Sequence, residues 1–166
     1  IVGVVALGLG QLITAIIDTL SGGNIFLMLV ITAVASLIIG MGLPTTATYI
    51  VMASLTAPAI VNIGAMNDFI VPLMAAHLFC FYFGILADDT PPVGLAAYAA
   101  AAIAKSPPIA TGIQGFMYDI RTAILPFMFI FNTDLLLIDV GLAKAVMVFF
   151  VSLVAMLLFA SATQGY

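Results

Sequence analysis

The chain has 166 residues, of which 65% are hydrophobic and 6% are charged, and its mean hydropathy is +1.36. Soluble domains carry about 25% charged residues, so this composition excludes an ordinary soluble domain and predicts an all-α polytopic membrane protein. The net charge of −4 is spread over few side chains and gives no support for nucleic-acid binding.

The first element is an apolar run over residues 1–17. As a helix it would reach about 26 Å, which is just enough to span a bilayer. Residues 18–24 are polar and predict a turn at a membrane surface, so residues 1–24 form one transmembrane unit. The run begins at Ile1 without an initiator Met or a basic signal sequence, and we expect the chain to be a piece of a longer protein.

Two further apolar stretches, residues 25–39 and 47–63, flank the sequence Gly-Met-Gly-Leu-Pro-Thr-Thr at positions 40–46. Glycine and proline interrupt helices, and Thr45 or Thr46 can cap the second helix. The first stretch is short and no charged loop follows it. We therefore interpret residues 25–63 as a re-entrant helical hairpin, with two ordinary spans joined by a tight turn as the alternative.

The next apolar segment, residues 69–104, is interrupted at its middle by Asp-Asp-Thr-Pro-Pro-Val-Gly at positions 88–94. Each proline in a helix interior costs about 3 kcal/mol, and an ionised Asp in hydrocarbon costs roughly 2.5 kcal/mol or more. The pattern predicts a discontinuous helix, with Pro72 in its first turns. Irregular backbone of this kind survives only where it is buried in protein or lines a wet cavity.

Two single side chains in this segment have alternative interpretations. His77 can be a proton carrier, because its pKa lies near neutral in water, or a hydrogen-bonded structural histidine. Cys80 is the one cysteine of the chain, so no disulfide framework is available. We expect Cys80 to be a small buried hydrophobe.

The C-terminal part is less regular. Residues 106–120 are more polar, and we expect them to lie along a membrane surface. Residues 121–166 should form C-terminal membrane helices. Pro126, Asn132 and Asp134 interrupt the first of these, which is either one kinked span or a short helix followed by a surface helix, and residues 145–160 form a plain span.

The few basic residues give an orientation by the positive-inside rule. Lys105 and Arg121 bracket residues 106–120, which places that segment on the cytoplasmic side. Both the hairpin and the discontinuous helix then open to the outside. Lys144 also falls outside, against the rule.

The sequences at 40–46 and 88–94 supply similar chemical groups. Helix ends leave carbonyls unsatisfied, and with threonine hydroxyls and a carboxylate they make an oxygen cage for a cation. Helix N-termini near Thr46 and Val93 present positive dipole ends to an anionic substrate. These features predict a cation-coupled carrier. We favour Asp88 as the carboxylate ligand and expect Asp89 to be protonated or paired with a basic residue elsewhere.

Three stretches carry a family resemblance: Gly-Met-Gly-Leu-Pro-Thr-Thr-Ala-Thr-Tyr-Ile at 40–50, His77 to Ala101 with Gly-Ile-Leu-Ala-Asp-Asp-Thr-Pro-Pro-Val-Gly inside it, and Tyr-Asp-Ile-Arg-Thr-Ala-Ile-Leu-Pro-Phe at 118–127. They resemble the large permease subunit of tripartite ATP-independent periplasmic (TRAP) transporters, most of all the branch with a fused permease chain (TAXI type). The resemblance covers about residues 25–135.

The resemblance implies an elevator-type carrier built from inverted repeats, of which this chain is the C-terminal half and residues 25–105 are one transport-domain repeat. It implies Na⁺-driven uptake of organic acids across a bacterial or archaeal inner membrane. The implied partners are a periplasmic substrate-binding protein and the remainder of the permease, namely the first repeat and the small-subunit scaffold.

The resemblance also implies a Na⁺ site between the hairpin and the interruption of the helix. The matching residues, with Asp88 added for its charge, are Gly40, Thr45, Thr46, Asp88, Thr90, Pro91 and Gly94. We expect the organic acid next to them, at Pro44, Thr45, Thr46, Asp89 and Val93. Other branches commonly have an acidic residue where Pro44 stands and an apolar one where Asp88 or Asp89 stands, so the carboxylate of this chain lies in the interruption.

Other functions remain open at this point. One alternative is a cation-coupled symporter of divalent anions that works without a binding protein. Another is a membrane scaffold subunit without a transport site, which should tolerate Thr46→Val and Asp88→Asn. An enzyme is disfavoured, because no nucleophile–base pair or metal-ligand set is recognisable in the sequence.

Overall fold

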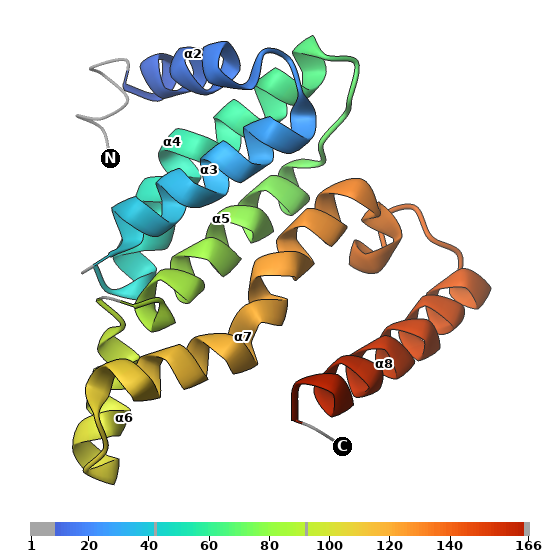
Figure 1. Ribbon diagram of the computed structural model, residues 1–166. Helices are drawn as coiled ribbons and strands as arrows, with labels where there is room; N and C mark the ends of the chain where they lie inside the picture. The colour runs from blue at the N-terminus through green and yellow to red at the C-terminus, as the bar shows by residue number, and fades with distance from the viewer. Residues whose placement is uncertain (1–8, 42, 92, 165–166) are drawn as a thin grey trace.

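The computed structural model describes residues 9–41, 43–91 and 93–164. In these residues the regular structure is helical throughout (Figure 1), so the predicted all-α class is confirmed. The elements are α2 (Leu9–Ser21), α3 (Ile25–Gly40), α4 (Thr45–Met66), α5 (Leu73–Asp89), α6 (Leu95–Ala104), α7 (Pro108–Phe131), the 3₁₀-helix η1 (Thr133–Leu136) and α8 (Leu142–Gln164).

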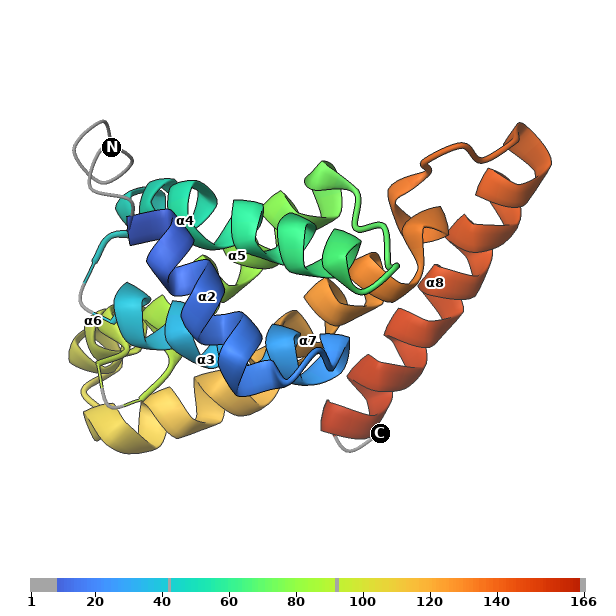
Figure 2. The same ribbon diagram turned by 90° about the horizontal axis from the view of Figure 1, so that it is seen from above.

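Helix α2 is longer at its C-terminal end than the sequence predicted. The polar residues after position 17 continue the helix because their hydroxyls bond to its own carbonyls: Thr19 Oγ1 donates to Ala15 O at 2.7 Å, and Ser21 Oγ donates to Asp18 O at 3.0 Å. Gly22 and Gly23, with φ of +55° and +79°, end the helix in a conformation that glycine adopts without strain. Figure 2 shows α2 lying across α3 and α4.

Helices α3 and α4 pack side by side (Figure 1), an arrangement that the re-entrant hairpin and two spans joined by a tight turn have in common. Asn24 caps α3 by accepting the N–H of Leu27 at 3.0 Å. The predicted threonine cap of α4 is wrong. The N-cap is Pro44, with φ −59° and ψ 143°, and no side chain caps the helix, because the hydroxyl of Thr45 bonds to α5 instead. Helix α4 also continues beyond position 63, to Met66.

The discontinuous helix is confirmed: α5 ends at Asp89 and α6 begins at Leu95. Pro72 is the N-cap of α5 and lies outside it, which corrects its expected place in the first turns. Lys105 adopts the left-handed conformation, with φ 53°, and donates its N–H to Ala101 O to end α6. We call residues 40–46 the tip and residues 88–94 the break.

Helix α7 corrects the prediction of a separate element over 106–120, because one helix runs from Pro108 to Phe131. A proline at the first helical position favours helix initiation, and the polar Thr122 hydroxyl is satisfied within the helix by the Asp119 carboxylate. The helix changes direction along its length (Figure 1). We attribute the bend to the buried Pro126, which lacks the N–H of a regular helix. Between Asn132 and the start of α8 lies the short η1.

The core lies where α5 packs against α4 on one side and α7 on the other. Phe79 is fully buried, and its ring centroid lies 4.8 Å from that of Phe83 and 5.3 Å from that of Phe127. Aromatic pairs at these separations add about 0.5–1.5 kcal/mol each beyond their burial. This ring cluster holds α7 against α5. The residues that follow the break are held in place together with α7.

Two of the described helices are long and apolar enough to cross a membrane, namely α4 over its whole length and α8 over Leu142–Thr163. None of that α8 segment is buried. Helix α8 stands at the edge of the bundle (Figures 1 and 2) and is held by an ion pair of 2.7 Å between Lys144 Nζ and Asp134 Oδ2. Most of its apolar side chains are therefore exposed in this structure.

The packing of α4 on α5 gives a first testable prediction. Cys80 is fully buried, and its Sγ lies 3.1 Å from Thr56 Oγ1. In native membranes containing the protein, we expect a maleimide to leave Cys80 unmodified and to modify it after SDS denaturation, as read by mass spectrometry of its peptide. A cysteine introduced at exposed Ala143 is the reactive control. Rapid native labelling of Cys80 would contradict the α4–α5 packing.

Candidate functional site

A side-chain hydrogen bond joins the tip to the break. The Thr45 hydroxyl, at the first residue of α4, donates to Asp88 Oδ2 in the last turn of α5. Both side chains are half-buried, and 43 positions separate them in the sequence. The structure thus brings together two of the residues that the sequence singled out for the cation.

The backbones of the tip and of α5 approach each other closely. An ideal Cβ on Gly40 would lie 2.5 Å from Ala87 Cβ and 3.0 Å from Thr48 Cγ2. Real Cβ atoms need more room than this, so only glycine lets α3 end against α5. Ala87, the residue before Asp88, therefore touches the end of α3. The first turn of α4, through Thr48, contacts the end of α3 at the same place.

Thr48 belongs to this contact, although the sequence did not single it out. It is fully buried, its hydroxyl donates to Leu43 O at 3.4 Å, and its methyl lies 3.5 Å from an ideal Cβ on Gly84. Residues three apart share a helix face. That spacing from Thr45, and the four-residue spacing of Gly84 from Asp88, were the signals that could have found it.

The break is compact. The Thr90 hydroxyl donates to Leu86 O at 2.6 Å, and Gly94 N donates to Thr90 O at 3.1 Å. An ideal Cβ on Gly94 would lie 3.2 Å from Asp89 O, and one on Gly112 of α7 would lie 3.4 Å from Pro91 Cγ. Helix α7 thus packs against the break through Gly112. The hydroxyl oxygen of Thr90 remains available as an acceptor.

The remaining predicted site residues are brought together less closely than Thr45 and Asp88. Pro44 and Thr46 are exposed, and within the described residues Thr46 makes no hydrogen bond to the break. Val93 is half-buried. Asp89 is half-buried beside the like charges of Asp119 and Asp88, so its neighbours are acidic, whereas one expectation was a basic partner.

The groups at the contact are oxygens, namely the Asp88 carboxylate and the Thr45 hydroxyl, and the Thr90 hydroxyl follows two residues after Asp88. Hard cations take oxygen ligands of these kinds. Over the ranges that the structure describes, no three His, Cys, Asp or Glu side chains gather as a metal site. The Asp88 carboxylate and the Thr45 hydroxyl are therefore the groups here that could hold a cation.

His77 lies away from this contact, on the α4-facing side of α5. Its Nδ1 is 3.1 Å from the Tyr49 hydroxyl, and both side chains are half-buried. Of its two predicted roles, this contact favours the hydrogen-bonded structural histidine.

Comparison with known protein families gives a match over most of the chain. The family model described as "Tripartite ATP-independent periplasmic transporter, DctM component" matches residues 1–144, which include the tip and the break. No curated protein and no solved structure matches the chain.

Proposed function

Because the chain belongs to the family of the DctM component of tripartite ATP-independent periplasmic transporters, we propose that it forms the Na⁺ site of a permease that imports organic acids. The family is one of transporters, whose permeases work with a periplasmic binding protein and other transporter subunits. We further propose that this chain is the second repeat of a fused permease and that the protein lies in the inner membrane.

The observation that carries the proposal is the Thr45–Asp88 contact between the tip and the break. A threonine and an aspartate that bond to each other between helix ends can also share a cation, with the Thr90 hydroxyl as a further oxygen. An anionic substrate would lie at the adjoining N-terminal ends of α4 and α6, where the helix dipoles favour negative charge.

Transport would follow the alternating-access scheme of carriers with broken helices at the binding site. In this chain, the residues of the tip and the break hold the ion and the substrate, and the ring cluster of Phe79, Phe83 and Phe127 keeps α5 and α7 together. We propose that α3 to α6, with α7 held on α5 by these rings, move as a unit of elevator type.

The test is uptake of radiolabelled organic acids into proteoliposomes containing the full-length permease and its binding protein. We expect an imposed Na⁺ gradient to drive uptake and a proton gradient alone to leave it near background. His77→Gln should change the Na⁺-driven rate by no more than about twofold, since glutamine can keep a hydrogen bond worth about 1 kcal/mol. Uptake that follows the proton gradient and disappears in His77→Gln would replace Na⁺ coupling with proton coupling.

A further inference from the structure

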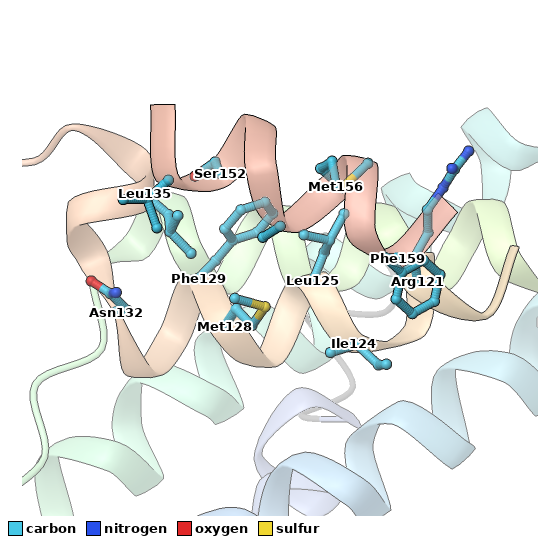
Figure 3. A pocket seen from close by; sticks show the side chains of 12 residues that line it. Arg121, Ile124, Leu125, Met128, Phe129, Asn132, Leu135, Ser152, Met156 and Phe159 are labelled. Atoms are coloured by element: carbon cyan, nitrogen blue, oxygen red, sulfur yellow. The ribbon is translucent and has the colours of Figure 1, made fainter. Parts of the chain in front are cut away.

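A groove lies between α7 and α8, away from the tip and the break. Its volume is about 440 Å³, within the roughly 300–1,000 Å³ of ligand pockets. Figure 3 shows Arg121 and Phe159 at one end of it and Leu135 and Ser152 at the other. The wall between them is mainly apolar and includes Leu125, Phe129 and Ala155.

The dimensions of the groove suit a single acyl chain. From Arg121 to Asn132 it follows α7 for about 16 Å at 1.5 Å per residue. An occupant must match this length and the volume of about 440 Å³. The same 16 Å is close to half of the roughly 30 Å hydrocarbon core of a bilayer. A single acyl chain of one leaflet fits both dimensions.

The charges of the two ends differ. Arg121 is exposed, and no ion-pair partner for it is found in the part of the chain that the structure covers. Beyond the other end, Lys144 is neutralised by Asp134 at 2.7 Å. A guanidinium binds phosphate oxygens through two parallel hydrogen bonds, and an arginine next to hydrocarbon is costly unless its charge is paired.

We propose that this groove binds an anionic phospholipid, with one acyl chain between α7 and α8 and the phosphate on Arg121. The lipid would fill the gap that α8 leaves beside α7 and so hold α8 against the bundle. The inference goes beyond ion coupling, and it requires only that the chain is embedded in a membrane.

The experiment is native mass spectrometry of the full-length permease in mild detergent, with equal amounts of dioleoyl phosphatidylglycerol and dioleoyl phosphatidylethanolamine added. Wild-type protein should retain phosphatidylglycerol in preference. Arg121→Gln should lower that preference about fivefold, the effect of one basic residue on an anionic lipid, and Lys105→Gln should leave it unchanged. Ala155→Phe fills the groove and should lose both lipids, whereas Val154→Phe places the same side chain on α8 outside the groove and should behave as wild type.

Three results would overturn the proposal. The first is equal retention of the two lipids by wild-type protein. The second is retention by Ala155→Phe that matches Val154→Phe. In the third, Ala155→Phe loses a second copy of the permease or another transporter subunit instead of lipid, which would make the groove a protein interface. Lipid retention is measured without transport, so its outcome is independent of Na⁺ coupling.

Discussion

Asp88→Asn in the full-length permease is expected to raise the Na⁺ concentration for half-maximal uptake by about 10- to 100-fold. Asparagine keeps the shape of the side chain and removes its charge, and interactions with a charged group contribute about 1.5–3 kcal/mol. The measurement is the Na⁺ concentration for half-maximal uptake in proteoliposomes. Thr45→Val removes the hydroxyl that bonds to Asp88. It should raise this Na⁺ concentration about fivefold, in line with about 1 kcal/mol for a neutral hydrogen bond.

Three matched variants make this result specific. Thr45→Ser keeps the hydroxyl and should restore the wild-type Na⁺ dependence. Asp134→Asn removes a carboxylate that pairs with Lys144 far from the tip and should change nothing. Thr46 is exposed, so Thr46→Val should have a smaller effect than Thr45→Val. If Asp88→Asn and Thr45→Val both transport as wild type does, the contact is structural and a scaffold subunit becomes the better reading.

Gly40→Ala is expected to destabilise the permease by about 1–3 kcal/mol, the usual cost of overpacking, and to reduce uptake with it. Its new methyl would lie 2.5 Å from Ala87 Cβ, and neither position has a flexible side chain that could yield. Thermal unfolding of the full-length protein in detergent measures the effect.

Gly115→Ala is the control, because an ideal Cβ on Gly115 of α7 meets nothing within 4 Å. Alanine is favoured over glycine inside a helix by about 1 kcal/mol, so this variant should be as stable as wild type or more so. Ala87→Gly in the Gly40→Ala background removes the facing Cβ and should recover part of the loss. Equal stability of Gly40→Ala and Gly115→Ala would mean that the tip does not rest on α5.

The sequence located the tip and the break because their signals are local. Proline and paired aspartates in an apolar run are costly wherever the chain goes, so the ends of α3, α5 and α6 were predictable to within a few residues. The threonine cap of α4 failed because the hydroxyl of Thr45 has a better partner in Asp88, which is distant in sequence. No local pattern indicates such a competition.

The extent of α7 was misjudged for a related reason. The composition of residues 106–120 is that of a surface segment, whereas in the structure a helix runs through it and packs closely at Gly112 against Pro91 and Ala97. The groove beside α8 was also beyond prediction. Arg121 stands at the end of the predicted surface segment, and Phe159 lies in a uniformly apolar run. Nothing in their spacing indicates that both residues line the same groove.

The bonds between α4 and α5 determine which relative motions of the two helices are easy. In the described residues three side-chain hydrogen bonds join them: Thr45 to Asp88, Tyr49 to His77 and Thr56 to Cys80. Sliding one helix along the other by a turn, about 5.4 Å, would break all three contacts together. Separation that starts at the tip breaks only the first. The pair of helices therefore resists sliding. Separation that begins at the end where the Asp88 carboxylate lies needs only one of these bonds to break. Access to that end does not require the two helices to part along their length.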